Sequence, residues 1–223
     1  MRYSLGVVFL STIVIAPQFE AVQTELFAAG NTLTNAWADF DNDGDLDLFV
    51  GFNGAPNRLY QNDGGTFRDV AADAGVADAR ATRAAAWGDY DADGDADLLV
   101  GFAPGTTSLL KLYRNQGGKF TDVSADAGVS VDSGAVRQPS FLDVDGDLDL
   151  FVGFNGAPNR LYQNDGGTFR DVAADAGVAD ARATRAAAWG DYDADGDADL
   201  LVGFAPGTTS LLKLYQNLSL IHI

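Results

Sequence analysis

Three short segments of the chain place an aspartate at every second position around a single glycine, in the order D-x-D-x-D-G-D-x-D. Oxygen ligands at the first, third and fifth positions, with a glycine that permits a sharp turn, can surround one hard cation. Two carboxylates about 4 Å apart repel each other by roughly 4 kcal/mol at an effective dielectric constant near 20, so several in one loop need a divalent cation between them. The pattern therefore predicts metal sites formed by Asp39, Asp41, Asp43, Asp45 and Asp47, by Asp89, Asp91, Asp93, Asp95 and Asp97, and by Asp191, Asp193, Asp195, Asp197 and Asp199.

The donor set indicates which metal these loops would hold. All side-chain ligands are oxygens, which favours calcium or magnesium over zinc or copper. Calcium fits better, because it accepts flexible coordination by six to eight oxygens. We expect the seventh position to contribute its main-chain carbonyl, while the side chains of Asp45, Asp95 and Asp197 point to solvent. With one ion per loop, about three calcium ions are predicted, and the alternative is an acidic, solvated turn that binds none.

The twelfth position of each loop separates it from EF-hand and dockerin loops, which need an acidic or amide ligand there and helices on both sides. In these segments that position is Val50, Val100 or Val202, inside an apolar run typical of a buried strand. The loops are therefore predicted to connect two strands, and they are not EF-hands.

One further acidic loop, the third in chain order, departs from the pattern. Its sequence is S-F-L-D-V-D-G-D-L-D-L-F-V over residues 140–152, and, compared from the preceding strand onward, it lacks two residues. Its first two aspartates then hold the first and third positions, and the ligand at the fifth position is missing. We predict a weak or absent site there, formed from the acidic residues that remain: Asp143, Asp145, Asp147 and Asp149.

Internal repeats decide how the loops are positioned. Residues 43–113 recur unchanged as residues 145–215, and each copy holds two related units. One unit contains four strand-like runs, and an N-D-G-G turn typical of a hairpin separates the last two. Trp37, Trp87 and Trp189 precede the acidic loops, and we expect them to pack between units, with stacking on sugars as the alternative.

Four short strands per unit of about 50 residues, without a long amphipathic helix, are the size and pattern of a propeller blade. The predicted fold is therefore an all-β β-propeller with four blade repeats, in a partial or a four-bladed ring. The units are roughly residues 22–70, 71–122, 123–172 and 173–217. The segment P-Q-F-E-A-V, residues 17–22, resembles a fourth strand, and the last unit stops after its third, so the N-terminal segment could complete the last blade. Of the two arrangements we favour the other, in which the four units are part of a larger ring with more blades.

Both ends of the sequence depart from the repeats. Arg2 precedes an apolar run from Leu5 to Ala16, which is the length of a signal-peptide core and short for a membrane span. We expect residues 1–21 to be a signal peptide, with a core strand as the alternative. Residues 218–223 break the repeat abruptly, and we expect them to be a non-native scar, with a genuine terminal strand as the alternative.

Composition excludes several classes of function. The chain has 223 residues and a formal net charge of −18, which opposes binding to nucleic acid and to anionic membranes. There is no cysteine, the single histidine is His222 in the terminal segment, and no serine lies in a nucleophile motif. Carboxylate pairs of the kind that glycosidases use occur within the metal loops, where they are already ligands. We therefore expect no enzymatic activity.

The repeat resembles a known family. The stretch A-W-A-D-F-D-N-D-G-D-L-D-L-F-V-G-F-N-G-A-P-N-R-L-Y-Q-N-D-G-G-T-F-R-D-V-A-A-D-A-G-V, residues 36–76, is similar to the FG-GAP/VCBS repeat found beside ASPIC/UnbV domains. The stretch D-A-D-G-D-A-D-L-L-V-G-F-A-P-G, residues 91–105, is similar to part of the integrin α-chain repeats. The resemblance covers about Phe19 to Asn217 and implies β-propeller blades with calcium between the first two strands.

These observations lead to an expected function. The chain is expected to be a secreted or cell-surface protein, with the periplasm as another possible location, and to bind calcium. Its expected role is that of a protein or glycan interaction module of the adhesion type, without membrane insertion of the mature chain. The alternatives are the non-catalytic propeller portion of a larger secreted enzyme and a repeat without a stable fold, because an open arc exposes strand edges and apolar faces.

Overall fold

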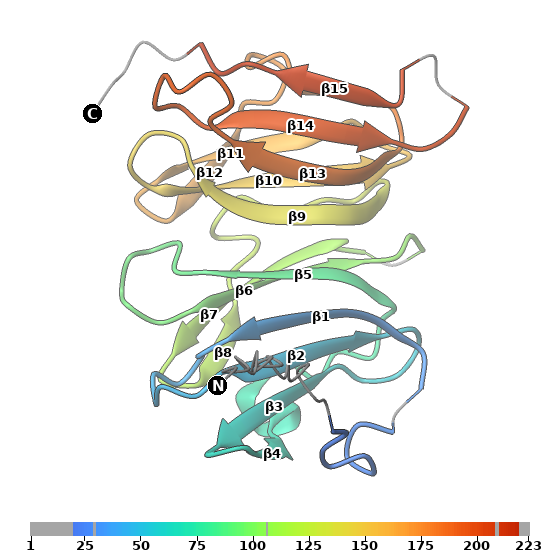
Figure 1. Cartoon of the computed structure of the whole chain (residues 1–223), viewed down its shortest axis with the longest axis vertical. Helices are drawn as coiled ribbons and strands as arrows, with labels where there is room; N and C mark the ends of the chain where they lie inside the picture. Colours follow the sequence, from blue (N-terminus) through green and yellow to red (C-terminus); the bar gives the residue numbers. More distant parts are fainter. Residues whose placement is uncertain (1–19, 29, 106, 208–209, 219–223) are drawn as a thin grey trace, which may run out of the picture.

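The structure is a computed structural model, described here for residues 20–28, 30–105, 107–207 and 210–218. Each repeat forms one antiparallel sheet, and the four sheets are stacked along the long axis of the molecule (Figure 1). The first sheet contains β1 (Thr32–Ala38), β2 (Asp47–Phe52), β3 (Arg58–Asp63) and β4 (Thr66–Asp69), followed by the short helix α1 (Ala71–Ala74). The second contains β5 (Thr82–Gly88), β6 (Asp97–Phe102), β7 (Leu110–Gln116) and β8 (Lys119–Asp122).

The third sheet contains β9 (Ala135–Asp143), β10 (Leu148–Asn155), β11 (Arg160–Asp165) and β12 (Thr168–Asp171), and the fourth contains β13 (Thr184–Gly190), β14 (Asp199–Phe204) and β15 (Leu212–Tyr215). In every sheet the strands lie side by side in sequence order, which is the arrangement of a propeller blade. The prediction of an all-β fold with four blade-like repeats is confirmed.

Stacking explains why the second strand of each sheet is a continuous apolar run after its one buried aspartate. Successive side chains of a strand point to opposite faces, and in the middle of the stack both faces are covered. Leu98 of β6 packs with Phe49 against the first sheet, whereas the next residue, Leu99, packs against the third. Both leucines are fully buried. An alternating pattern would have left one of these faces polar and unable to form a core.

The tryptophans before the loops lie between sheets, as expected, where a preceding sheet is available. The indole nitrogen of Trp87 donates to the main-chain oxygen of Ala36 at 3.2 Å, and its ring meets Phe49 edge-on. Trp189 makes the same kind of contact with Phe151 of the third sheet. Trp37 belongs to the first sheet, which no other sheet precedes among the described residues, and its side chain is 53% exposed.

The stack is an open arc rather than a closed ring, with the first and fourth sheets at opposite ends (Figure 1). Residues 17–19 lie outside the described part of the chain, and residues 20–22 form no strand. The side chain of Gln23 pairs with the main chain of Phe67 in β4, so the described N-terminal segment covers the first sheet. The fourth sheet keeps three strands among the described residues, and the predicted completion of the last blade by residues 17–22 is not observed there. Residues 1–19 of the predicted signal peptide and residues 219–223 of the predicted scar lie outside the described residues.

Candidate metal centres

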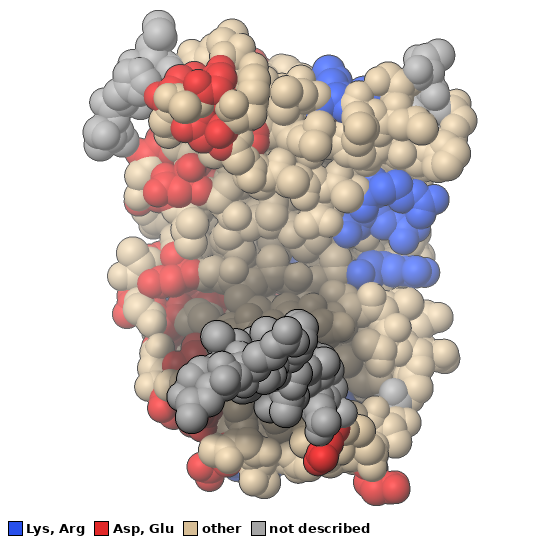
Figure 2. Space-filling model, viewed as in Figure 1, with Lys and Arg blue, Asp and Glu red and all other residues tan. Residues whose placement is uncertain are grey.

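The three full acidic segments lie in the loops that join the first strand of a sheet to the second. Strand pairing runs directly up to each loop and ends with the pairs Ala38–Asp47, Gly88–Asp97 and Gly190–Asp199. Because the sheets are stacked, these loops share one edge of the molecule. Acidic side chains gather along one side of the surface view, and basic side chains lie on the other side (Figure 2). The fold thus positions the loops through the pairing of two strands.

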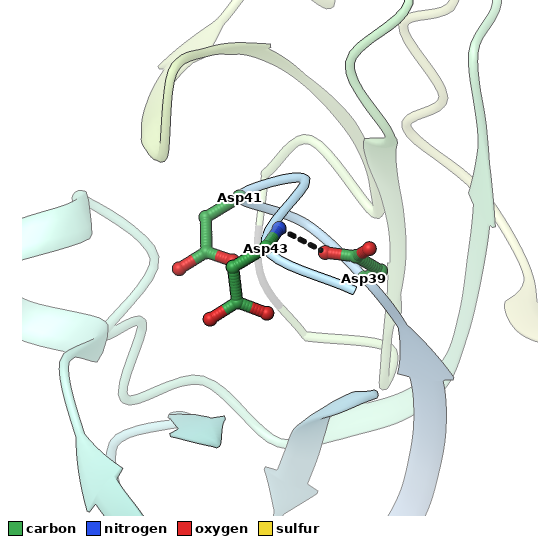
Figure 3. Close-up of side chains that lie close together, drawn as sticks. All are labelled: Asp39, Asp41 and Asp43. Atoms are coloured by element: carbon green, nitrogen blue, oxygen red, sulfur yellow. Dashed lines mark hydrogen bonds between the residues drawn. The ribbon is translucent and has the colours of Figure 1, made fainter. Parts of the chain in front are cut away.

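Each loop brings three carboxylates together. One oxygen from each of three aspartates lies within 4.8 Å of the oxygens of the other two. Figure 3 shows the group in the first loop, where Asp41 and Asp43 lie side by side and Asp39 faces the turn. The three groups are Asp39, Asp41 and Asp43; Asp89, Asp91 and Asp97; and Asp191, Asp193 and Asp199.

The aspartate at the first position holds the turn. In the first loop, the two carboxylate oxygens of Asp39 accept hydrogen bonds from the main-chain N–H groups of Asp43 and Gly44, at 3.1 and 3.0 Å. Asp89 and Asp191 make the same pair of bonds in their loops. Gly44 has a φ of 93°, which a residue with a side chain rarely adopts. The glycine and the first aspartate therefore define one loop conformation together.

The fourth position of each full loop, directly after its second aspartate, is also left-handed. Asn42 has a φ of 59°, and the corresponding Ala92 and Ala194 have φ values of 57° and 62°. Asparagine tolerates this region, but an alanine there costs roughly 1–2 kcal/mol relative to a right-handed conformation. Both copies of the alanine loop have this strained geometry, which is of the kind that clusters at ligand-binding sites.

The aspartate at the third position has an unpaired oxygen. Oδ2 of Asp41 accepts a hydrogen bond from Nε2 of Gln61, whereas Oδ1 is inaccessible to solvent and has no hydrogen-bond partner. Oδ1 of Asp91 is in the same state in the second loop. Burial, and then repulsion by Asp43, raise the pKa of Asp41 above its usual value. A buried carboxylate oxygen without a partner is costly, and a bound cation would satisfy it.

The aspartate at the ninth position is fully buried at the start of the second strand. Asp47 accepts hydrogen bonds from the N–H groups of Asn62 and Phe40, at 2.8 and 3.0 Å. Burial nevertheless raises the pKa of the Asp47 carboxyl to about 6 and that of Asp97 to about 7. Asp97 and Asp199 belong to their carboxylate groups, whereas Asp43 takes that place in the first loop. The aspartate at the ninth position thus joins the loop to the hairpin between the third and fourth strands of the same sheet.

The expectation for the seventh position is wrong in two loops. The side chain of Asp45 does not point to solvent, because its Oδ2 accepts a hydrogen bond from the N–H of Gly64 at 2.7 Å. Asp95 accepts the corresponding bond from Gly117 at 2.8 Å. Both glycines lie in the hairpin between the third and fourth strands of the same sheet, so this carboxylate attaches the loop to that hairpin. No such bond to Asp197 occurs among the described residues of the fourth sheet.

The shortened third loop keeps the first two ligand positions. The N–H of Val144 donates to Asp149, as that of Phe40 does to Asp47 in the first loop. Nε2 of Gln163 donates to Asp145 at 2.6 Å, which matches the Gln61–Asp41 bond. The two missing residues therefore fall between Asp145 and Gly146. In the described part of the chain, Asp143, Asp145, Asp147 and Asp149 form no group of three converging carboxylates.

The repeats that carry these loops match a known family. The FG-GAP-like repeat family matches residues 39–100 and 142–202, and each match begins at an acidic loop and continues into the next repeat. The chain belongs to the FG-GAP-like repeat family. FG-GAP repeats on a β-propeller-like fold suggest a protein-interaction module.

No curated protein matches this FG-GAP repeat protein. Among solved structures, it is similar to the crystal structure of BBS1N in complex with ARL6DN, soaked with lead, with 14% sequence identity and a TM-score of 0.47. That match covers 82% of this chain and 52% of the BBS1N chain, so this chain spans about half the length of that structure. No described helix is long and apolar enough to cross a membrane.

Sequence reasoning missed the amides that surround the FG-GAP loops. The glutamine at the end of each L-Y-Q segment donates a hydrogen bond to the aspartate at the third loop position, as Gln61, Gln163 and Gln216 do. The asparagine after this glutamine donates its main-chain N–H to the aspartate at the ninth loop position, as Asn62 does to Asp47. The recurrence of Y-Q-N one hairpin away from every loop but the second, where the residues are Tyr113, Arg114 and Asn115, was a signal for these contacts.

A row of arginines was also missed. Arg83, Arg137 and Arg185 lie near the beginning of β5, β9 and β13, at the ends of these strands opposite to the acidic loops. Burial, and then the charges of Arg83 and Arg185, lower the pKa of Arg137. Among the described residues none of the three forms an ion pair, and the Nε atoms of Arg83 and Arg137 are buried without a hydrogen-bond partner. The charge of the protein is therefore separated between two edges.

Proposed function

We propose that this FG-GAP protein is a calcium-dependent interaction module that acts outside the cell, and that calcium holds each acidic loop in its binding-competent shape. The observation that carries the proposal is the pair of buried, unpaired carboxylate oxygens, Oδ1 of Asp41 and Oδ1 of Asp91. Each belongs to a group of three carboxylates, and a cation is the partner that satisfies all three at once.

The ligand set supports calcium as the ion. The residues that would hold it in the first loop are Asp39, Asp41 and Asp43, with Asp47 behind them at the start of β2. All donors are oxygens on a loop that remains partly exposed, and this suits the variable coordination of calcium better than the strict octahedron of magnesium. When bound, the ion neutralises the repulsion within the loop and offsets the strain of its left-handed residue.

The sites are expected to differ in affinity. In the second loop the three carboxylates are half-buried or buried, whereas in the fourth loop Asp191 and Asp193 are exposed. Exposed ligands are solvated and lose more freedom on binding, so the fourth loop is the weaker of the two. Extracellular modules commonly bind calcium with dissociation constants of about 10⁻⁴–10⁻³ M, which extracellular calcium saturates.

Thermal unfolding tests the proposed structural role of calcium. The chain is stripped with EDTA and unfolded in the presence of calcium, of magnesium or of neither. Calcium at 100 times its dissociation constant stabilises the folded state by about 2.7 kcal/mol per site, so a clear rise in Tm is expected, with a smaller one in magnesium. An unchanged Tm at saturating calcium would refute this role. A larger rise in Tm with magnesium than with calcium would identify magnesium as the ion that the loops bind.

The proposed role is binding rather than catalysis, since the loop carboxylates accept hydrogen bonds from main-chain N–H groups of their own loop. The row formed by Arg83, Arg137 and Arg185 supports a partner that carries acidic groups, because these guanidinium groups have no counterion among the described residues. A sulfated glycan is a suitable probe. Replacement of all three arginines by alanine should abolish its binding to the calcium-loaded chain, and equal binding by the variant would contradict this assignment.

The proposed location rests on the apolar run from Leu5 to Ala16 and on the calcium loops. Expression of the chain in a host that secretes proteins tests it. N-terminal sequencing of exported material should show that cleavage occurred near residue 21. Retention of the full chain inside the cell would contradict secretion without affecting the calcium proposal.

A further inference from the structure

Two identical stretches of sequence have different surroundings in this molecule. Residues 82–113 of the second repeat and residues 184–215 of the fourth are the same. Leu110 and Leu112 of β7 are fully buried, whereas the corresponding Leu212 and Leu214 of β15 are 63% and 51% exposed. Since the two sequences are identical, the difference in exposure arises from the neighbours that cover each sheet and not from the residues of the sheet itself.

The exposed residues form one face. We call it the trailing face of the fourth sheet, because it points away from the third, and it consists of Tyr192, Leu201, Leu212 and Leu214. Leu201 is 40% and Tyr192 is 56% exposed, whereas their counterparts Leu99 and Tyr90 are 0% and 6% exposed. Four large apolar side chains on one sheet face are typical of an interface that lacks its partner.

The second repeat shows what fits this face. Its trailing residues Leu99, Leu110 and Leu112 pack in one cluster with Leu150 and Tyr162 of the third sheet. A polar contact borders the cluster, in which Nδ2 of Asn164 donates to the main-chain oxygen of Tyr90 at 2.8 Å. The ring of Phe169 packs on the ring of Tyr90, with centroids 5.7 Å apart. The matching surface is thus a leading face with its own apolar residues and one amide donor.

That leading face exists a second time in the chain. Residues 43–74 repeat as residues 145–176, so Leu48, Tyr60, Asn62 and Phe67 in the first sheet correspond to Leu150, Tyr162, Asn164 and Phe169. We call these four residues, together with the exposed Trp37, the leading face of the first sheet. The two faces that match each other lie at opposite ends of one arc (Figure 1).

We propose that the trailing face of the fourth sheet binds the leading face of the first sheet in a second copy of this chain, so that copies associate head to tail. The contact would repeat the junction between the second and third sheets. The amide of Asn62 would then meet the main-chain oxygen of Tyr192, as Asn164 meets that of Tyr90. Such a contact is heterologous and leaves one free face at each end, so it extends into open chains or closes into rings of several copies.

The segment that covers the first sheet is compatible with this contact. Leu26 and Phe27 pack on Val50, Phe52 and Tyr60. In the junction of the second and third sheets, the segment after β8 occupies the same kind of place, with Ala127, Val129 and Val131 in the cluster. The main-chain oxygen of Ala127 accepts a hydrogen bond from Phe169, much as Gln23 accepts one from Phe67. The N-terminal segment therefore supplies a part of the junction that the described residues of the fourth sheet do not provide.

Sedimentation of the calcium-loaded chain over a range of concentrations gives the first test. The wild-type chain should show an average mass that rises with concentration to at least twice that of the monomer. The double substitution L212D/L214D places charges on the trailing face and should abolish this rise. L218D is the matched control, because Leu218 is also exposed but lines the groove between the third and fourth sheets. A wild-type chain that stays monomeric, as a ring closed within one chain would, overturns the proposal.

Mixing two blocked variants tests the head-to-tail geometry. W37E changes the leading face, and L212D/L214D changes the trailing face, so each alone should be monomeric. An equimolar mixture should form a dimer, because one intact face of each kind remains. If W37E associates as strongly as the wild-type chain, the contact joins two trailing faces and the proposal fails. Tm values within a few degrees of wild type show that the variants are folded, since all three substituted side chains are more than half exposed.

Discussion

Nδ2 of Asn115 donates a hydrogen bond to the main-chain oxygen of Phe40 at 2.7 Å, and this bond joins the hairpin of the second sheet to the acidic loop of the first. Phe40 occupies the second position of that loop, between two of its converging aspartates. Asn164 makes the same bond to Tyr90, one sheet further along the arc. The geometry of each loop is thus coupled to the position of the next sheet, which links the proposed calcium sites to the stacking of the repeats.

The bond between Asn115 and Phe40 can be isolated with a matched pair of variants. Asn62 makes the same contacts within its own sheet, where it donates to Leu46 and Asp47 and accepts from Gly65, but it has no sheet before it. N115A should therefore lower the free energy of unfolding by about 1–3 kcal/mol more than N62A does, because it leaves a buried carbonyl unpaired. Urea unfolding measures both values. Equal losses for the two variants would show that the contact between sheets contributes nothing.

Substitution of one ligand should remove one calcium ion. In D41N the unpaired carboxylate oxygen becomes part of a neutral amide, so the first loop should lose most of its affinity while the other loops keep theirs. D63N changes the net charge by the same amount at an exposed residue of β3 and serves as the control. Native mass spectrometry in calcium should show one ion fewer for D41N and no change for D63N. Equal occupancy in both variants would exclude Asp41 as a ligand.

The shortened third loop offers a gain of function. Insertion of Asn-Asp after Asp145 restores the spacing of the first loop and supplies a carboxylate at the missing fifth position. Asp143, Asp145 and Gln163 already hold the places of their counterparts. The insertion should add one calcium ion to the number bound by the wild-type chain. An unchanged number, with the protein still folded, would mean that carboxylate spacing alone does not create a site.

Acid should weaken the ion pair between Asp180 and Arg182, which lies in the segment before β13. The hydrogen bonds from Arg182, whose Nη2 lies 2.6 Å from Asp180, lower the pKa of Asp180 to about 2. The carboxyl of an unfolded chain has a pKa near 3.9, so this pair stabilises the folded state above about pH 4, and the stabilisation is lost as the pH falls toward 2. The difference in urea midpoint between the wild-type chain and D180N should shrink from pH 6 to pH 3. A difference that is the same at both values would contradict the lowered pKa.

Much of the site could be predicted from the sequence because the loop ligands are close together in the chain. The order D-x-D-x-D-G-D determines a turn within a few residues, so the convergence of Asp39, Asp41 and Asp43 follows from local spacing. The shortened third loop could be recognised in the same way. The repeat length and the four strand-like runs per unit likewise predict the stacked sheets.

Contacts between distant residues were not predictable in this way. The side chain of Asp45 was expected in solvent, but it accepts a hydrogen bond from Gly64, which lies 19 residues away on a hairpin that strand pairing brings beside the loop. The arginine row arises because β5, β9 and β13 pack against one another, although their sequences are about 50 residues apart. Such contacts depend on the register and stacking of the sheets, which composition and spacing do not specify.

The number of calcium ions that the stripped chain binds tests the central claim most directly. Calorimetric titration with calcium should give about three ions per chain, one for each loop with three converging carboxylates. Repeating the titration with the combined variant D41N/D91N/D193N should remove the binding heat. No binding heat for the wild-type chain, or the same heat for the combined variant, would contradict the assignment of these loops as calcium sites.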